Sequence, residues 1–235
     1  MQKFLTARWQ DLIMANYEVV PSLLEPRLPA GTELDLQDGK CFVSLVGFMF
    51  LETRVLGIPI PFHINFEEVN LRFYNKRETD GEMRRAVCFV KEIVPRFAIA
   101  TVARVLYGEP YECWAMSHAR SERSVSYNWS KRGCRNHLSV EIDESVGVPA
   151  DGSHGEFIIE HYWGYTKRGG NRVDEYKVEH PKWELFSVKN EVINVDFAGT
   201  YGDEFAFLAD EKPYSVLLAK GSEVAVYKGK QLTLV

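Results

Sequence analysis

The sequence predicts a mainly β (α+β) protein with a few short helices, folded as a single domain over residues 1–235. Three observations support this fold class. Strand-like runs rich in branched and aromatic residues recur along the chain, one segment has clear helical periodicity, and no linker, internal repeat or low-complexity stretch divides the sequence. Many strands with few helices favour a closed barrel or a sandwich over β-α-β units.

The clearest strand signal is in residues 41–50, which are rich in Val, Phe and Leu and follow the Asp38-Gly39 turn. Two prolines lie in residues 57–62, and each removes a donor from a strand ladder. That segment is therefore predicted to be an edge strand or an extended crossing segment. The other predicted strands are residues 66–74, 86–94, 156–165 and 183–195. Polar, turn-rich loops are predicted at residues 74–82, 147–155 and 166–172.

One helix is predicted to begin at Pro95, because proline is favoured in the first turn. Gly108 supplies a C-terminal stop, and Pro110 prevents continuation. A second, short helix is expected at residues 21–25. The first helix has an i, i+3, i+4, i+7 face that is predicted to be buried, formed by Ile99, Val102, Ala103 and Leu106.

Composition argues against several classes of function. A net charge of −5 leaves no broad basic field for a phosphate backbone, so nucleic acid is not an expected partner. No apolar run approaches the roughly 20 residues that cross a bilayer. Arg8 and Asp11 interrupt the N-terminal apolar residues, so no signal peptide is expected. We expect a cytoplasmic protein, with no membrane partner, whose widely spaced cysteines are reduced thiols that hold no metal. These cysteines are Cys41, Cys88, Cys113 and Cys134.

Residues 66–74 alternate between an apolar face and a mixed face. Glu68 and Arg72 lie on the mixed face, together with aromatic residues at both ends. One interpretation is a solvent-exposed sheet face on which these two charges form a surface pair; the other is a polar wall inside a barrel. The residues alone favour the exposed interpretation, because antiparallel sheets commonly leave one face in water.

Residues 156–165 carry apolar side chains on both faces of the predicted strand. Glu160 and His161 are therefore expected to be partly buried, and buried ionisable groups need partners or shifted pKa values. His161 is either a structural histidine that is satisfied by a backbone carbonyl, or an acid, base or ligand anchor. Glu160 has the same functional alternatives.

Charged residues also lie where the strand of residues 86–94 meets the predicted helix. Arg96 falls in the first helical turn, where a cation is slightly unfavourable against the helix dipole. Glu92 or a bound anion would offset this, although solvation is also sufficient. No nucleophile elbow, P-loop, HExxH or GxGxxG motif is present, and no cofactor is expected.

Several motifs in order along the chain resemble the uncharacterised YqjF-like bacterial family, over residues 9–205. The family is similar in fold to acetoacetate decarboxylase, which implies a cone-shaped β-barrel around an interior cavity. It also implies that Glu68, Arg72 and His161 face that cavity. The motifs that carry the resemblance are residues 17–24, 28–32, 66–72, 92–96, 160–165 and 179–183.

The resemblance also carries a negative implication. The decarboxylase places its Schiff-base lysine, with a second lysine beside it, just after a Gly-x-Pro turn. The matching stretch here is residues 108–112, and Tyr111 and Glu112 occupy the two lysine positions. Neither side chain can form an imine, so lysine-imine decarboxylation at this position is not expected.

Two hypotheses about function remain at this point. The first is a cavity that binds a small carboxylate or oxo-acid, with or without lyase, hydratase or isomerase chemistry. Its catalytic candidates are Glu68, Tyr111 and His161. Its substrate-binding candidates are Arg72, Glu92, Arg96, Glu160 and Trp163, with Arg72 as the anchor for a carboxylate or enolate. The second is a non-enzymatic ligand sensor or self-associating module, and a homo-oligomer is compatible with either.

Overall fold

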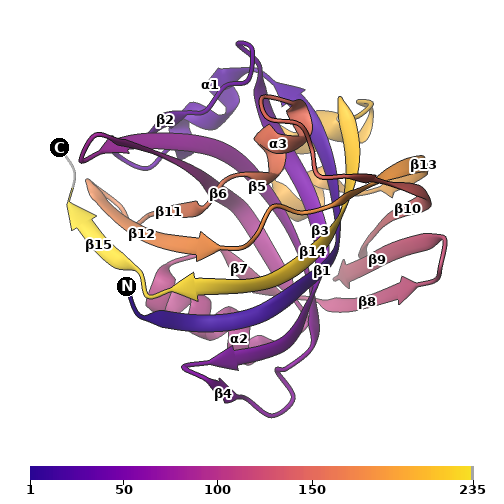
Figure 1. The fold of residues 1–235 in the computed structure, drawn as a ribbon, viewed down its shortest axis with the longest axis horizontal. Coiled ribbons are helices and arrows are strands. Elements are labelled where there is room, and N and C mark those ends of the chain that lie inside the picture. Colours follow the sequence, from indigo (N-terminus) through magenta and orange to yellow (C-terminus); the bar gives the residue numbers. More distant parts are fainter. Residues whose placement is uncertain (234–235) are drawn as a thin grey trace.

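The computed structural model describes residues 1–233, which form a strongly curved sheet around an enclosed interior (Figure 1). Seven strands close into a ring in the order β14, β1, β3, β5, β6, β11 and β12, and a short β12–β14 pairing completes it. The ring strands are β1 (Lys3–Val19), β3 (Cys41–Val55), β5 (Phe66–Thr79), β6 (Glu82–Val94), β11 (Trp163–Lys167), β12 (Arg172–Glu179) and β14 (Ser215–Tyr227).

The remaining described strands extend or flank this ring. β14 also pairs with β13, and the sheet continues through β10, β9 and β8. β7 pairs with β6 in parallel, as does β11. The flanking strands are β2 (Glu33–Leu34), β4 (Ile58–Pro59), β7 (Tyr111–Cys113), β8 (Ala115–Arg120), β9 (Ser124–Lys131), β10 (Cys134–Gly147), β13 (Leu185–Asn194) and β15 (Lys230–Thr233).

The helical segments are short, as the sequence predicts. They are α1 (Pro21–Leu24), η1 (Glu25–Arg27), α2 (Phe97–Val102), η2 (Ala103–Tyr107), α3 (His154–Ile159), α4 (Phe197–Tyr201) and η3 (Asp203–Ala209). Within residues 1–233, no helix has the length and apolar character that a membrane crossing requires.

Most of the predicted strands are present. β3, β5 and β6 cover their predicted segments, β13 covers the predicted segment 183–195 except at its ends, and β4 is an edge strand that pairs with β3. The loop prediction for residues 74–82 is wrong, because β5 and β6 continue to a tight turn at Asp80-Gly81. Both turn residues have positive φ, at 54° and 75°, as a two-residue hairpin turn requires.

The strand prediction for residues 156–165 is wrong over its first half. Residues His154–Ile159 form α3, and β11 begins only at Trp163. The Ser153 hydroxyl accepts a hydrogen bond from the Glu156 amide at 3.3 Å, which caps the helix. Ser-His-Gly-Glu before an apolar run is a capping-box pattern, and this local cap outweighs the apparent alternation.

The predicted helix after β6 is present but has a different buried face. α2 begins at Phe97, with Arg96 at the N-cap, and Gly108 terminates the following turn at φ 63°. Ala100 is fully buried, whereas Val102 is 47% exposed. Ile99 and Val102 line a cavity, and Ile99 also packs against a buried apolar cluster. The side chain of Leu106 lies outside the described residues.

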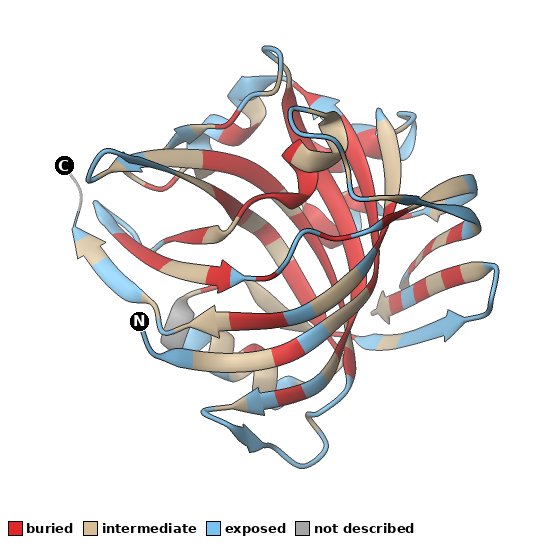
Figure 2. Ribbon diagram, in the orientation of Figure 1, coloured by how far each residue is buried: buried red, intermediate tan, exposed pale blue. Residues whose placement is uncertain are grey.

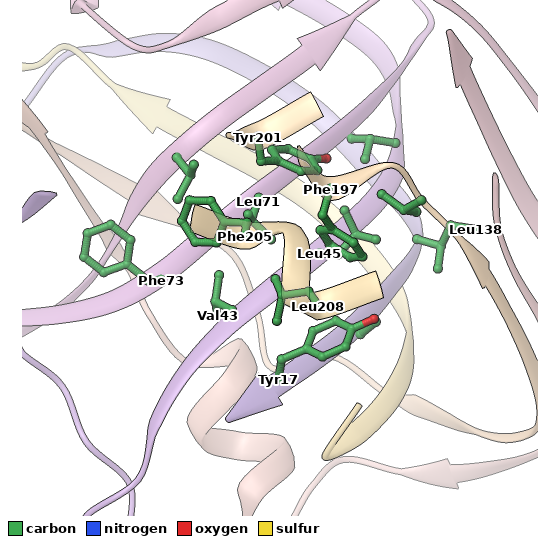
Figure 3. Packing of buried hydrophobic residues seen from close by; sticks show 14 of the residues in the cluster. Tyr17, Val43, Leu45, Leu71, Phe73, Leu138, Phe197, Tyr201, Phe205 and Leu208 are labelled. Carbon is green, nitrogen blue, oxygen red and sulfur yellow. The ribbon is translucent and has the colours of Figure 1, made fainter. Parts of the chain in front are cut away.

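β5 is buried over most of its length (Figure 2), and its apolar face lies on the outside of the ring. Leu71 and Phe73 lie with neighbouring β3 residues beneath the α4–η3 segment, whose Phe197, Phe205 and Leu208 complete this cluster (Figure 3). The opposite face of β5 is therefore turned toward the interior of the ring, where the candidate site lies.

Candidate functional site

A cavity of about 450 Å³ lies inside the ring. Its wall is mainly apolar, with a limited set of polar and ionisable side chains, which is the usual composition of a ligand pocket. The polar and ionisable lining residues are Thr53, His63, Glu68, Asn70, Arg72, Glu92, Glu109, Tyr111, His161, Tyr176 and His180.

β5 contributes three of these side chains from one face. Glu68, Asn70 and Arg72 alternate along the strand, and all three line the cavity. The interpretation that the sequence favoured, a solvent-exposed face, is therefore wrong: Glu68 is only 2% exposed. The α4–η3 segment covers the other face of the strand, so neither face is left in water.

Glu68 lies at the centre of a hydrogen-bonded group. It accepts hydrogen bonds from the Asn70 amide at 2.9 Å and from the Tyr111 hydroxyl at 3.0 Å. Burial raises the pKa of Glu68 to about 7, against the opposing effect of these hydrogen bonds and of the Arg72 charge. The carboxyl can therefore exchange a proton near neutral pH.

Two further buried carboxyls share the cavity wall with Glu68. Glu109 accepts a hydrogen bond from the Thr166 hydroxyl at 2.5 Å, and burial raises its pKa to about 7. Burial, with the charges of Glu109 and Glu68, raises the pKa of Glu92 well above its ordinary value. Such a cluster does not carry three negative charges at neutral pH.

Arg72 is the cation of this wall. Its Nη2 donates to the Ile158 carbonyl at 3.3 Å, and its Nε is buried without a hydrogen-bond partner in the part of the chain that the structure describes. Among the described residues, no carboxylate lies within ion-pair distance of the guanidinium. A partly buried cation whose Nε donor is unsatisfied is suited to receive an anionic ligand group.

His161 also lines the cavity, from the segment between α3 and β11. Its partner is the Asp35 carboxylate, 3.1 Å from Nε2, rather than a backbone carbonyl. Burial lowers the pKa of His161 to about 4, so the ring is neutral. Burial acts to raise the pKa of Asp35, but hydrogen bonds from His161 and Arg85 lower it overall. His161 Nδ1 is buried and has no hydrogen-bond partner among the described residues.

Of the other predicted site residues, one lines the cavity and two do not. Trp163 lines the cavity, and the Arg84 guanidinium lies 4.2 Å from the centre of its ring. Arg96 and Glu160 are not part of the lining. Glu160 is buried, as predicted, and accepts a hydrogen bond from the Tyr162 hydroxyl.

The lining residues that the sequence did not predict include Glu109, Tyr176 and His180. Glu109 is the middle residue of the Gly-x-Pro turn at residues 108–110, and that turn is the sequence feature that could have indicated its position in the site. Tyr176 lies against Glu109, and its phenol occupies the space above Gly164, which has no side chain. His180 stacks on Trp183 with ring centres 4.0 Å apart.

Tyr111 and Glu112 point in different directions from β7. Tyr111 enters the cavity, whereas Glu112 accepts from Lys91 and Lys131, each at 2.8 Å. No lysine is among the lining side chains in the described part of the chain. Residues 1–233 also contain no group of three or more His, Cys, Asp or Glu side chains placed to hold a metal ion.

Solved structures define the class of fold. Acetoacetate decarboxylase from Legionella pneumophila subsp. pneumophila str. Philadelphia 1 is similar with a TM-score of 0.70 and 12% identity, over 98% of this chain and 88% of that chain. An acetoacetate decarboxylase-like enzyme from Sphingomonas wittichii RW1 gives 0.67 and 14%, over 100% and 95%. The enduracididine biosynthesis enzyme MppR, complexed with pyruvate, gives 0.67 and 14%, over 98% and 91%. This chain therefore has an acetoacetate decarboxylase-like fold, as the resemblance implied.

The family model of DUF2071, an uncharacterized conserved protein (COG2071), matches residues 6–223. The protein belongs to this family. It is also similar to the uncharacterized protein YqjF of Bacillus subtilis (strain 168), with 36% identity over 67 residues. That match covers 28% of this chain and 28% of YqjF, well under two thirds of the relative's length. The predicted membership of a YqjF-like family is confirmed.

Proposed function

We propose that this protein binds a small organic acid of the oxo-acid type in the ring cavity and acts on it by proton transfer. One observation carries the proposal: Arg72, a cation with a buried unpartnered donor, shares the cavity with Glu68, whose pKa is raised to about 7. A fixed cation and a carboxyl that titrates near neutral pH are the two groups that enolisation of an oxo-acid requires.

In this proposal, Arg72 holds the ligand carboxylate through paired N–H donors. Glu68 in its ionised form removes a proton from the carbon beside the carbonyl, and becomes a neutral carboxyl as the ligand becomes an enolate. As Glu68 becomes protonated, the Tyr111 hydroxyl turns its single proton from Glu68 to the enolate oxygen, which Arg72 also stabilises. Glu68 returns its proton at the end of the step. Some lyase, hydratase and isomerase reactions of oxo-acids pass through such an intermediate.

Two facts support an oxo-acid ligand without imine chemistry. A protein of the same fold, MppR, has been solved with pyruvate. The position that the resemblance assigns to the Schiff-base lysine is Tyr111, a phenol that contacts Glu68. The proposal therefore assigns the ligand carbonyl to hydrogen bonding and not to covalent attachment.

Calorimetric titration with pyruvate, 2-oxobutanoate and acetoacetate tests the proposal. We expect saturable binding of at least one acid, weakened at least about tenfold in Arg72→Ala, the cost of losing a hydrogen bond to a charged group. Arg135→Ala, at an exposed position outside the cavity lining, is the matched control and should bind normally. Undiminished binding in Arg72→Ala, or no binding of any of the acids, would overturn the assignment.

A second candidate, self-association without catalysis, is favoured by exposed apolar side chains on two neighbouring surface segments. Phe62 is 87% exposed after β4, and Phe97 is 69% exposed at the start of α2. Burying these side chains between two copies of the chain would remove them from water. Light scattering would detect a dimer, and Phe62→Asp should dissociate it; a monomer at all concentrations excludes this candidate.

A further inference from the structure

We propose that the ligand of the cavity is amphiphilic: an organic acid whose head group lies among the ionisable residues and whose apolar tail extends toward the mouth between α2 and the β4–β5 loop. The inference rests on the proposed function for the head group. The tail is a separate claim, because it depends on the size of the cavity and on the distribution of apolar side chains along it.

The cavity is too large for a short oxo-acid alone. Its volume of about 450 Å³ lies in the range of pockets that hold drug-sized ligands. At roughly 30 Å³ for each non-hydrogen atom, the volume of a water molecule in the liquid, pyruvate occupies roughly 180 Å³. More than half of the space remains after the head group is placed.

The remaining wall is aromatic on one side. Phe66, the first residue of β5, lines the cavity two residues before Glu68. The Phe66 ring stacks on the Phe50 ring at a centroid distance of 4.7 Å. Phe50 contacts Phe48 at 5.2 Å, and Trp9 contacts both of these rings at 5.1 and 5.7 Å. These four rings form a continuous apolar surface that starts where the carboxyl cluster ends.

Aliphatic side chains complete the outer part of the wall. Ile99 and Val102 of α2 line it from one side, and Ile60 lines it from the β4–β5 loop. Val102 is 47% exposed and Ile60 is 40% exposed, whereas Glu68 is 2% exposed. The three carboxyls are therefore deep, since Glu92 and Glu109 are only 3% and 5% exposed, whereas aliphatic side chains reach the surface. A bound acid would enter with its head group first and leave its tail at the mouth.

The rim around this mouth is also apolar. Ile58 and Phe62 on either side of Ile60 are 62% and 87% exposed, and Phe97 at the start of α2 is 69% exposed. Such exposed groups cost free energy in water unless an apolar partner covers them. A ligand tail that extends out of the cavity would cover part of this rim.

The test is a calorimetric series of straight-chain 2-oxo-acids from pyruvate to 2-oxooctanoate. Each methylene that enters an apolar site should tighten binding about fourfold, so five added methylenes should give about 1,000-fold. A dissociation constant that does not change along the series would overturn the amphiphilic ligand and leave the proposed function intact. No binding of any member would overturn both, and 1-octanol binding as tightly as 2-oxooctanoate would overturn the acidic head group alone.

A pair of variants on one helical segment sharpens the test. Val102→Asp places a charge in the apolar wall and should reduce the affinity gain between pyruvate and 2-oxooctanoate by at least about tenfold. Val105→Asp is the matched control, because Val105 is 70% exposed and is not part of the cavity lining. It should leave the chain-length dependence unchanged. Equal effects of the two variants would contradict a tail site beside α2.

Discussion

The Tyr111 hydroxyl donates a hydrogen bond to the Glu68 carboxyl at 3.0 Å across the floor of the cavity. The contact arises because β7 lies parallel to β6, where Tyr111 is the register partner of Glu92. β5 pairs with the other edge of β6 and places Asn70 opposite Glu92. Three adjacent strands thus bring a phenol and two carboxyls together, and this group determines how the protein should respond to pH.

Glu68→Gln should remove a pH-dependent loss of stability. Burial raises the folded-state pKa of Glu68 to about 7, so the folded protein binds this proton more tightly than the unfolded chain. The contribution is fully present below the unfolded pKa and is lost as pH rises through about 7. Urea unfolding from pH 4.5 to 8 should show a smaller decline in the variant, by up to about 3 kcal/mol.

The informative quantity is the difference in unfolding free energy between the wild type and Glu68→Gln at each pH. The pKa of His161 and that of His180 are both lowered by burial to about 4, so their contributions increase with pH up to about 6.5 and partly hide the effect of Glu68. Glu78→Gln, at an exposed position of the same strand, is the control and should follow the wild type. Parallel wild-type and Glu68→Gln curves would contradict a raised pKa at Glu68.

His161 should be present as the Nε2–H tautomer at neutral pH. Hydrogen bonds from His161 and Arg85 keep Asp35 ionised, and an ionised carboxylate accepts but does not donate. Nitrogen-15 spectra should therefore show a protonated Nε2 and an unprotonated Nδ1. Asp35→Asn should weaken this preference and cost about 1–3 kcal/mol of stability. A wild-type ring protonated at Nδ1 would refute the arrangement.

Gly164→Ala should displace Tyr176 from the cavity wall. A Cβ atom at residue 164 would overlap the phenol ring of Tyr176, which lies directly over the glycine. The expected cost is about 1–3 kcal/mol, typical of overpacking. In a Tyr176→Ala background the ring is absent, so the same substitution should cost much less. Equal costs in the two backgrounds would show that the ring does not require this glycine.

Ser44→Ala should destabilise the ring by about 2 kcal/mol without touching the cavity. The Ser44 hydroxyl lies 2.6 Å from the Asn16 side-chain oxygen and 2.7 Å from the Tyr74 hydroxyl, and all three residues are buried. Removing it leaves two buried polar groups without this partner. Ser117→Ala, on an exposed strand, should change stability by less than about 0.5 kcal/mol in the same denaturant titration.

Much of the fold could be predicted from local patterns. β3, β5 and β6 contain uninterrupted runs of branched and aromatic residues, and the Asp80-Gly81 turn between β5 and β6 has a sequence signal of its own. β1 was not predicted, because charged residues interrupt its alternation. Asp11 has φ 54°, and the β1–β3 register shifts between Gln10 and Ile13, so a bulge conceals the pattern.

The candidate site was predictable only in part. Alternation placed Glu68 and Arg72 on one face of a strand, but whether that face is buried depends on α4 and η3, which lie more than 100 residues later in the chain. Only the family resemblance indicated a cavity. Glu109 interacts with both Tyr176 and Glu68, and these three residues come from segments that are far apart in the sequence. Hydrophobic periodicity describes one segment at a time, so it cannot predict such contacts.

A crystal structure of the protein soaked with pyruvate tests the central claim most directly. We expect the pyruvate carboxylate within about 3 Å of the Arg72 guanidinium, with the methyl carbon facing Glu68 and the carbonyl oxygen facing Tyr111. Pyruvate bound elsewhere, or in the cavity without contact to Arg72, would contradict the proposed role of this wall.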